Sequence, residues 1–394
     1  MIRAALDQRL QTVGAPADLG LAPTEQRLVE DLLTRSFAGL HFVSEAYTAR
    51  LTLMLALDLG WEARLHRGAT LEELLTGLHP QSRLPAAWML AFLTEEGLLD
   101  HLDGRWHLRS LPDFERDLAT LRELAEEMAP GHLKNLDLLD AVRQKVLPYF
   151  TEGRHGEELL FDLSAYPLWL DYFRNENQIY RANNLFAYAA LRPCIREGCR
   201  ILELGGGAGS FAQFLSARGQ EEGFLGQIAD YHFTDVAPTF LRRAQRGLKD
   251  LAPGLPLTFA SLDLNRPLDE QGLRDSTFDV ILGVNVLHVA KDLQATLREL
   301  NSHLAPGGKL VLGECLKPDL TRPIYLEFAF QFMAGFTDVT LDPDLRPTYG
   351  FLTPEAWVKA LHAAGFQEVL EVPRVRPLMA HWEFFNVGAF VAGA

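Results

Sequence analysis

The chain has 394 residues, of which 48% are hydrophobic, and a formal net charge of −15 at pH 7. This length exceeds what one average hydrophobic core requires, so we expect two domains. The negative charge would repel phosphate backbones and anionic lipid headgroups, which argues against nucleic acid and membranes as partners.

The sequence gives no sign of export. No apolar run is long enough to cross a bilayer, and the first residues lack the apolar segment and cleavage site of a signal peptide. We therefore expect a cytoplasmic protein. Three cysteines (Cys194, Cys199 and Cys315) are too few for a disulfide framework, and no second pair is present for a structural zinc site, so no metal is expected.

The N-terminal quarter predicts an arm followed by a winged-helix-like domain. Residues 1–25 show no sustained period and are expected to form a loosely packed arm. Residues 26–115 contain two helices, a short helix capped by Thr70, a further helix over 84–97 and two short strands joined by Asp103-Gly104. Asp-Gly between such runs is a strong hairpin signal, and this order of elements is typical of a winged helix.

A winged helix often binds DNA, but the residues here disfavour that function. Where a recognition helix would lie, residues 84–97 contain no Lys or Arg and carry Glu95 and Glu96. We expect this region instead to pack against a second subunit, as a homodimer through the N-terminal domain, or against the next domain. The side chains expected at that contact are Trp88, Met89 and Phe92.

Residues 116–185 are predicted to form a helical linker and an active-site lid. Their later part is rich in aromatic side chains, interleaved with polar groups, and comes directly before a glycine-rich loop. Such a segment could be hydrophobic core, or it could cover a binding site. Tyr172 and Tyr180 are the candidates there for contact with a ligand.

Residues 186–394 are predicted to form a Rossmann-like α/β domain. From Arg200 onward, short apolar strands alternate with helices, which indicates a mostly parallel sheet between two helical layers. The last two strands are expected to form an antiparallel hairpin at the edge of the sheet. Ligands of such sheets bind at the carboxyl ends of the strands.

The glycine loop at residues 205–209 follows the first of these strands. A dinucleotide-binding loop would read G-x-G-x-x-G, whereas serine occupies the sixth place here, at Ser210. Glu203 lies beside the loop, where its carboxylate would repel a diphosphate and attract an ammonium or a sulfonium. The loop therefore favours a cationic nucleoside over a dinucleotide.

Two further acids end the next strands. Asp235, followed by Val236, could accept hydrogen bonds from both hydroxyls of a ribose. Asp263 could accept one from an adenine amino group, with the Leu264 amide nearby. Each aspartate alone could simply initiate a turn, so their joint spacing is the signal.

Together these motifs resemble those of class I S-adenosylmethionine-dependent methyltransferases. The resemblance rests on Glu203-x-Gly-x-Gly-x-Gly, Asp235, Asp263, the run FDVILGVNVLH and the turn APGGKLVL. It implies S-adenosylmethionine as the cofactor. The residues that it implies around the cofactor are Glu203, Gly205, Gly206 and Gly207 at the methionine end, Asp235 and Val236 at the ribose, Asp263 and Leu264 at the adenine, and Asn285 beneath the methionine part.

A histidine and a glutamate follow neighbouring strands and could form a base. Carboxyl ends of neighbouring parallel strands lie side by side, so Glu314 could hold one nitrogen of His288 and leave the other for the acceptor. The surrounding sequence is similar to the C-methyltransferase domains of polyketide synthases, in which a histidine and a glutamate at these places form the catalytic pair. An upstream tyrosine also assists in that family, and Tyr180 or Tyr172 could match it.

The N-terminal domain resembles a different group, the small-molecule O-methyltransferases. Those enzymes often carry His-Asp-Trp at the base, whereas this chain has His288-Val289-Ala290. The acceptor could therefore be carbon or oxygen, and the residues favour carbon.

The acceptor pocket is expected to combine the aromatic lid with an insertion after the fifth strand of the domain. Its predicted contacts are Phe332, Met333 and Phe336, together with Tyr172. An apolar, polyketide-like or aromatic acceptor follows, either free or tethered to a carrier protein. The alternatives are O-methylation by the same base and a nucleoside-binding winged-helix regulator.

Overall fold

The computed structural model of the chain describes residues 2–11, 23–274 and 277–393. They divide into two compact units. Unit 1 consists of Glu30–Tyr172, Asp319–Thr337 and the described part of Met1–Pro16. Unit 2 consists of Phe173–Pro318, Asp338–Ala394 and the described part of Ala17–Val29. Each unit is built from more than one stretch of the sequence.

Unit 1 is helical apart from one hairpin. Its elements are α1 (Ile2–Leu10), α3 (Arg35–Asp58), α4 (Glu62–Arg67), α5 (Leu71–Leu75), α6 (Arg83–Glu95), β1 (Leu99–Leu102), β2 (Arg105–Leu108), α7 (Phe114–Met128), α8 (Leu133–Lys145), α9 (Leu147–Glu152), α10 (Gly156–Leu160), α11 (Tyr166–Tyr172) and α16 (Ala334–Thr337). A further helix, α2 (Pro23–Leu32), has residues in both units.

The local signals in the N-terminal sequence form as predicted. The Thr70 hydroxyl accepts from the Glu73 amide, and the Glu73 carboxylate accepts from the Thr70 amide, which completes a capping box at α5. Asp103 and Gly104 have φ angles of 51° and 74° and close the hairpin between β1 and β2. The predicted arm contains a helix, α1, whose Leu6 is buried.

The apolar face of α6 is covered within unit 1. Trp88, Met89 and Phe92 are all buried, and the Trp88 Nε1–H donates to the Glu327 carboxylate at 2.8 Å. The Trp88 ring also lies 6.1 Å from the ring of Phe328. The segment 319–337 therefore occupies the face that the sequence assigned to a second subunit or the next domain, and these three side chains offer no exposed surface for dimerisation.

Unit 2 is an α/β structure around a seven-stranded sheet. Its elements are α12 (Gln178–Leu191), β3 (Cys199–Leu204), α13 (Ser210–Glu222), β4 (Ile228–Asp235), α14 (Pro238–Leu251), β5 (Leu257–Ser261), β6 (Phe278–Val284), α15 (Leu293–Ser302), β7 (Leu304–Cys315), α17 (Pro354–Ala363), β8 (Glu368–Val372), α18 (Val375–His381) and β9 (Val387–Gly393).

The strand order is β5-β4-β3-β6-β7-β9-β8. The first five strands are parallel, and β9 runs antiparallel to both β7 and β8. The predicted fold class is thus confirmed, including an antiparallel pair at one edge. Within that pair, the last strand of the chain lies inside the sheet and β8 forms the edge.

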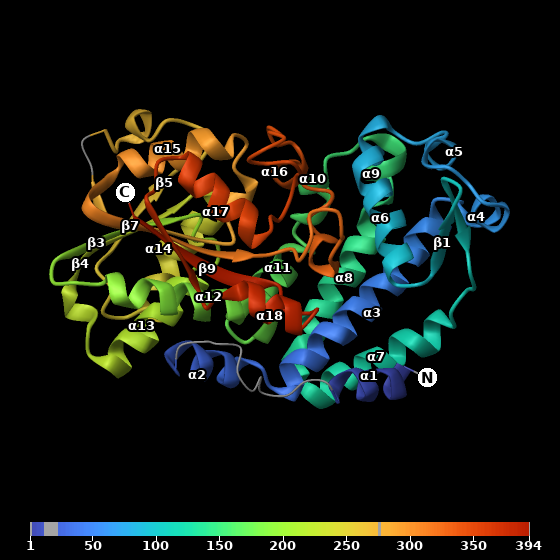
Figure 1. Ribbon diagram of the computed structural model, residues 1–394, viewed down its shortest axis with the longest axis horizontal. Coiled ribbons are helices and arrows are strands. Elements are labelled where there is room, and N and C mark those ends of the chain that lie inside the picture. The colour runs from blue at the N-terminus through green and yellow to red at the C-terminus, as the bar shows by residue number, and fades with distance from the viewer. Residues whose placement is uncertain (1, 12–22, 275–276, 394) are drawn as a thin grey trace. The chain divides into compact units, whose positions relative to one another are not determined.

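Helices cover both faces of this sheet (Figure 1). The contacts link α12 to α13 and α13 to α14 on one face, and α15 to α17 on the other. The strands β3 and β6 are adjacent, although the chain leaves β3 towards β4 and β5 on one side and returns through β6 to the other. The carboxyl ends of β3 and β6 therefore flank the crevice where such sheets bind ligands.

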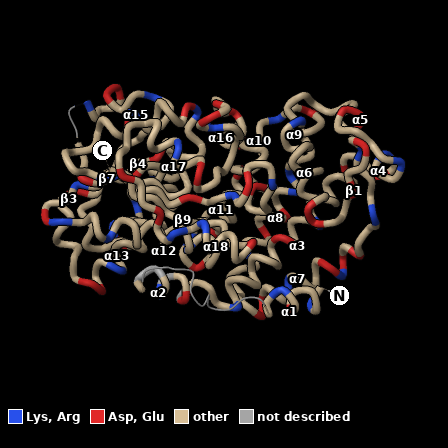
Figure 2. The backbone as a smooth tube through the Cα atoms, viewed as in Figure 1, with Lys and Arg blue, Asp and Glu red and all other residues tan. Residues whose placement is uncertain are grey.

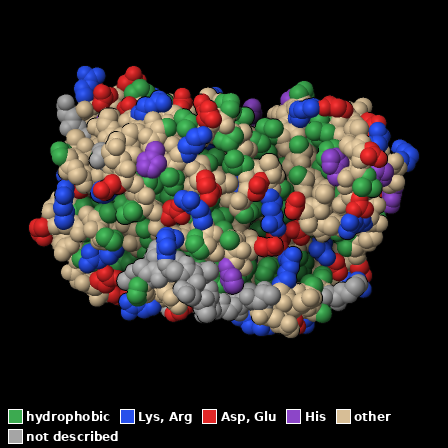
Figure 3. All heavy atoms as spheres, viewed as in Figure 1, with side chains coloured by type: hydrophobic (Ala, Val, Ile, Leu, Met, Phe, Trp, Pro, Cys, Tyr) green, Lys and Arg blue, Asp and Glu red, His purple; other side chains and the backbone are tan. Residues whose placement is uncertain are grey.

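Acidic and basic residues are interspersed along the backbone in both units (Figure 2). Side chains of both signs also cover the face drawn in Figure 3. Among the described residues, no helix combines the length and the apolar character that a membrane span requires.

Candidate functional site

The glycine loop connects β3 to α13. Gly205, Gly207 and Gly209 have φ angles of 56°, 54° and 77°, in the left-handed region that favours glycine. A Cβ at Gly205 would lie 2.3 Å from Val286, and one at Gly206 would lie 2.3 Å from the buried Phe233 ring. A Cβ at Gly207 would meet no atom closer than 3.9 Å. Packing thus requires the first two glycines, and Gly207 alone has open space where a ligand could approach the backbone.

Glu203 lies on β3 and is only 2% exposed. Its Oε2 atom is buried and has no hydrogen-bond partner among the residues that the structure describes. Burial raises the pKa of Glu203 to about 8, and the nearby Tyr231 hydroxyl opposes part of this rise. A buried, unsatisfied carboxyl group of this kind is suited to a cationic or hydroxyl-bearing ligand.

Asp235 ends β4 and holds the glycine loop. Its two carboxylate oxygens accept from the Gly207 amide at 2.8 Å and from the Ala237 amide at 2.7 Å. Burial raises the pKa of Asp235, and these two amides oppose the rise. Each oxygen keeps a further lone pair, so anchoring the loop is compatible with accepting from a ribose. Val236, beside it, is 59% exposed.

Asp263 follows β5 and forms a turn. Its Oδ1 accepts from the Asn265 amide at 2.9 Å, and its own amide donates to Gln271. The backbone links this turn to the previous strand, because the Leu262 amide donates to the Asp235 carbonyl oxygen at 3.3 Å. The structure therefore brings Glu203, Asp235 and Asp263 to the carboxyl ends of three neighbouring strands, β3, β4 and β5. Their contacts with a ligand stay a prediction.

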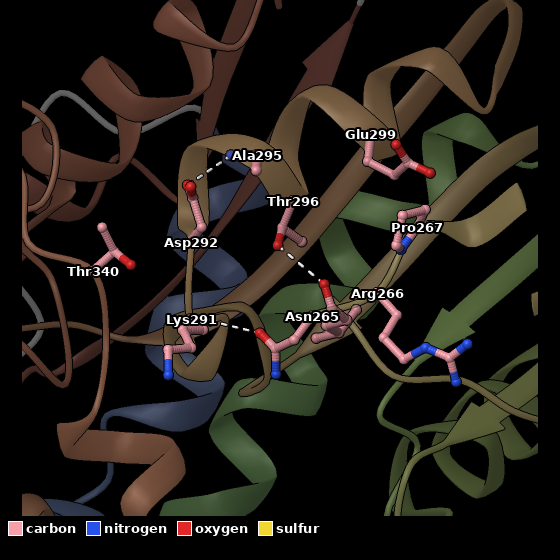
Figure 4. Close-up of a pocket in the computed structure, with 10 residues that line it drawn as sticks. Asn265, Arg266, Pro267, Lys291, Asp292, Ala295, Thr296, Glu299 and Thr340 are labelled. Carbon is pink, nitrogen blue, oxygen red and sulfur yellow. Dashed lines mark hydrogen bonds between the residues drawn. The ribbon is translucent and has the colours of Figure 1, made fainter. Parts of the chain in front are cut away.

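A cavity of about 350 Å³ lies beside Leu264 (Figure 4). The Leu264 carbonyl accepts from the Thr296 hydroxyl, and the Asn265 side chain accepts from the Lys291 amide. These bonds link the turn after β5 to the start of α15, and the cavity lies between these two segments. Leu264 is the one residue of the predicted site in its lining, whose members are Leu264, Asn265, Arg266, Pro267, Lys291, Asp292, Ala295, Thr296, Glu299 and Thr340.

His288 and Glu314 form a buried pair, as we predicted from their positions after two adjacent parallel strands. The His288 Nδ1 lies 2.7 Å from Glu314 Oε2, and the other carboxylate oxygen accepts from the Leu287 amide at 2.9 Å. His288 is 4% exposed and Glu314 is fully buried. With the carboxylate as acceptor, Nδ1 carries the hydrogen and Nε2 carries the lone pair.

Asn285 positions the turn that carries this histidine. Its backbone has a φ of 55°, which is uncommon outside glycine. Its amide donates to the Gly313 carbonyl at 2.7 Å, and its Oδ1 accepts from the Cys315 amide at 2.9 Å. Asn285 therefore ties the end of β6 to the end of β7, on either side of Glu314. Its predicted place beneath the cofactor stays a prediction.

The two candidate tyrosines lie in different units. Tyr180 is in α12 of unit 2, where burial raises the pKa of its phenol, a hydrogen bond with Ser210 opposes the rise, and the charges of Glu203 and Glu314 add to it. Tyr172 is in unit 1, where its ring contacts the rings of Trp169 and Phe330. Within unit 2, Tyr180 is thus close to the predicted base.

The predicted acceptor wall falls in unit 1. Phe336 is buried and its ring lies 5.7 Å from that of Phe330, which also contacts Tyr172. Phe332 is buried against the rings of Tyr149 and Phe150. Met333 is partly exposed. The structure thus brings the aromatic segment and the insertion together, with Phe332 in the core, and contact with an acceptor stays a prediction.

Sequence reasoning missed two residues beside His288. Arg346 is 1% exposed and donates to the His288 carbonyl oxygen at 2.5 Å. The Phe351 ring lies 4.7 Å from the His288 ring. Both belong to the stretch between α16 and α17, residues 338–353, which has no periodic pattern. An arginine in such a loop is ordinarily exposed, so the sequence carried no signal of its burial.

Comparisons with known proteins identify the kind of domain that carries these residues. Residues 202–310 match a family model described as a methyltransferase domain. The chain is 33% identical over 278 residues to highly reducing polyketide synthase 2 of Gibberella zeae, covering 66% of this chain and 10% of that protein. It is 32% identical over 192 residues to the lovastatin diketide synthase lovF of Aspergillus terreus, covering 48% and 7%. The chain thus spans about a tenth or less of these relatives.

Solved structures resemble the chain over nearly its whole length. The CurJ carbon methyltransferase has a TM-score of 0.76 and 22% identity, covering 98% of this chain and 99% of that one. The citrinin polyketide synthase CMeT domain has a TM-score of 0.72 and 17% identity, covering 99% and 97%. At such identities the likeness establishes the fold. The resemblance of the N-terminal region to O-methyltransferases stays a prediction.

The resemblance seen in the sequence is thereby confirmed at the level of fold and homology. The chain has the fold of the S-adenosylmethionine-dependent methyltransferases, carries a methyltransferase domain at residues 202–310, and is homologous to segments of polyketide synthases.

Proposed function

We propose that this chain transfers a methyl group from S-adenosylmethionine to an enolisable carbon of a polyketide-like acceptor, with His288 as general base. The observation that carries the proposal is the buried His288–Glu314 pair, with 2.7 Å between Nδ1 and Oε2. A hydrogen on Nδ1 leaves the lone pair on Nε2, the state that a base requires. Homology to polyketide synthases supports the class of acceptor.

The residues at the sheet edge fit the cofactor. Glu203 offers a buried carboxyl oxygen without a partner among the described residues, and Gly207 leaves its backbone open to a ligand. Glu203 and Gly207 would hold the methionine end, Asp235 the ribose, and Asp263 with Leu264 the adenine. When bound, S-adenosylmethionine supplies a methyl group on a positively charged sulfur.

The protein side chains then perform three tasks. The Glu314 carboxylate fixes the His288 ring and stabilises the imidazolium that forms when Nε2 accepts the proton. Asn285 holds the ends of β6 and β7 together, which sets the position of that ring. Tyr180, rather than Tyr172, is the tyrosine that we propose to assist, because it shares unit 2 with the base.

We further propose that the acceptor is a thioester tethered to a carrier. The support is that the relatives are polyketide synthases, of which this chain spans a small part. The same base could serve a phenol or enol hydroxyl, so the position of the new methyl group decides between carbon and oxygen.

A His288→Gln variant tests the base. Incubation with S-adenosylmethionine and the pantetheine thioester of acetoacetate should give a C-methylated product, and the variant should lose about 10²–10⁴-fold in kcat. Mass spectrometry measures the rate, and NMR locates the methyl group. Affinity for S-adenosylhomocysteine, measured by calorimetry, should stay unchanged.

The matched control is His381→Gln. His381 is exposed on α18 of the same unit, so this variant removes an imidazole that is not part of the His288–Glu314 pair. A His288→Gln variant with the rate of the wild-type protein would rule out the base. A methyl group found on oxygen would rule out carbon as the acceptor atom.

A further inference from the structure

Arg346 is a buried cation attached to the turn of the proposed base. It is 1% exposed, and its Nη2 donates to the backbone carbonyl of His288 at 2.5 Å. Its own backbone exchanges hydrogen bonds with Asp342 at 2.9 and 3.0 Å, which fixes the loop that carries it. The guanidinium is thus held against the backbone of the residue that carries the imidazole.

The remaining donors of this guanidinium are unsatisfied. Arg346 Nε and Nη1 are buried and have no hydrogen-bond partner among the described residues. Burial lowers the pKa of Arg346 to about 10, and the charge of Glu314 opposes this. Buried donors of a charged group are nearly always paired in folded proteins, because leaving them unpaired costs free energy. An oxygen atom of a bound ligand would pair these two donors.

From this we infer a subsite at Arg346 for the carbonyl oxygen of a β-dicarbonyl acceptor, in which Nε and Nη1 donate to the oxygen that becomes the enolate. This inference rests on the proposed function and names its substrate class. His288 Nε2 takes the proton from the carbon between the two carbonyl groups, and the C–H electron pair moves onto the oxygen at Arg346. The electron pair then moves from the enolate oxygen back to the carbon and forms the new C–C bond to the methyl group. The C–S bond breaks at the same time and leaves a neutral thioether.

A cation at this place favours carbon over oxygen as the methyl acceptor. In an enolate, most of the charge is on oxygen while the carbon forms the bond, so donors on the oxygen stabilise the anion without blocking the carbon. In O-methylation the same oxygen is the nucleophile, and a guanidinium bound to it would compete with the methyl group. Arg346 therefore acts as a catalytic residue for carbon acids.

The test uses Arg346→Gln and Arg346→Lys in the full chain, with Arg298→Gln as the matched control. Arg298 is exposed on α15 of the same unit, so its replacement removes the same charge outside the site. The probe is the pantetheine thioester of acetoacetate. We expect Arg346→Gln to lose about 10²–10³-fold in kcat, as when one oxyanion donor is removed, with unchanged affinity for S-adenosylhomocysteine.

Lysine keeps the charge but lacks the planar fork that serves both His288 and a second oxygen. Arg346→Lys should therefore lose at least about tenfold in kcat. If Arg346→Gln does not fold, the kcat of Arg346→Lys alone tests the subsite. A folded Arg346→Lys or Arg346→Gln with wild-type kcat would overturn the subsite.

A second measurement separates this subsite from methyl transfer. With S-adenosylhomocysteine present, the wild-type protein should accelerate the exchange of the α-hydrogen of the 2-methylacetoacetyl thioester with deuterium oxide, followed by mass spectrometry. Arg346→Gln should abolish that acceleration and Arg298→Gln should keep it. Equal acceleration in Arg346→Gln contradicts the subsite while the proposed function stands, whereas a wild-type protein that neither exchanges nor methylates the probe contradicts the proposed function.

Discussion

At the scale of single residues, the protonation of Glu203 links cofactor binding to pH. Burial raises the pKa of this carboxyl group to about 8, so near pH 7 most of the free protein carries it protonated. A cationic ligand favours the ionised form. Binding should therefore release a proton wherever the free protein holds one.

The resulting prediction concerns the affinity for S-adenosylmethionine. We expect affinity to rise as the pH increases from about 6.5 to about 8.5, by at most about tenfold per pH unit, and to level off above the pKa of the free carboxyl group. Calorimetry in buffers of different ionisation enthalpy measures the released proton.

The control variants for this prediction are Glu203→Gln and Glu197→Gln. Glu203→Gln should bind more weakly and lose this part of the pH dependence. Glu197 is exposed just before β3, so its variant should behave as the wild-type protein does. An affinity that is flat with pH in the wild-type protein would show that Glu203 does not face the charge of the ligand.

At the scale of structural elements, packing holds the glycine loop in place. The loop packs so closely on β4 that a Cβ at Gly206 would lie 2.3 Å from the fully buried ring of Phe233. A methyl group added there must displace a fully buried ring on β4. The loop would move with it, because the Gly206 amide donates to the Thr234 carbonyl at 2.8 Å.

Gly206→Ala should therefore lower the free energy of unfolding by about 1–3 kcal/mol and weaken the binding of S-adenosylhomocysteine. Gly247, inside α14, has no atom within 3.9 Å of its ideal Cβ. Gly247→Ala should stabilise the protein by about 0.5–1 kcal/mol, because helical glycine is unfavourable. Urea denaturation measures both, and equal stability of the two variants would refute the packing argument.

Unit 1 contains two buried histidines on adjacent elements. The His132 Nδ1 accepts from the Asn135 side-chain amide at 2.9 Å, and its Nε2 is hydrogen-bonded to the Ser44 hydroxyl at 2.8 Å. His41 contacts the Tyr325 hydroxyl at 2.8 Å. Burial lowers the pKa of His41 to about 3, with His132 adding to the effect, and lowers the pKa of His132 to about 4. Both are therefore neutral in the folded protein at neutral pH.

These shifts predict how stability depends on pH. The folded state binds these protons less readily than the unfolded chain, so the contribution is complete above about pH 6.5 and is lost as the pH falls towards the folded pKa values. Between about pH 7.5 and about pH 5, the titration of each histidine should lower the free energy of unfolding by about 2 kcal/mol. Urea titrations should show a weaker dependence in the His41→Gln/His132→Gln double variant, and an unchanged one in the exposed control His66→Gln. A double variant with the wild-type pH dependence would contradict this assignment.

At the scale of the whole molecule, charge and homology bear on the partner. The net charge of −15 disfavours nucleic acid, and α6, which takes the place of a recognition helix, is buried over most of its length and exposes an acidic residue, Glu95, at its end. A regulatory function therefore has little support. Homology to polyketide synthases is the ground for our proposal that the acceptor is delivered on a carrier.

A comparison of acceptors tests that delivery. If the carrier contributes to binding, the carrier-bound acetoacetyl thioester should have a kcat/KM about tenfold or more above that of the free pantetheine thioester, mainly through KM. Steady-state kinetics on both acceptors measures the difference. Equal values would indicate that the protein recognises the acyl chain alone.

The sequence predicted those features that depend on near neighbours in the chain or on general rules for sheets. Alternation of strands and helices indicated the parallel sheet, and Asp103-Gly104 indicated the hairpin. The pairing of His288 with Glu314 also followed, because residues that end adjacent parallel strands must lie side by side. Each of these needs only local conformation or the order of the strands.

Other features depended on contacts between distant segments, which no periodicity reveals. The segment 319–337 belongs to unit 1 and covers Trp88, although it follows β7 of unit 2. The shifted pKa of Glu203 comes from burial, and the role of Arg346 comes from donors that the fold leaves unpaired. The sequence by itself therefore determined the fold class and the proposed base. Only the tertiary structure decided which charges are buried, because burial is a property of the packed chain.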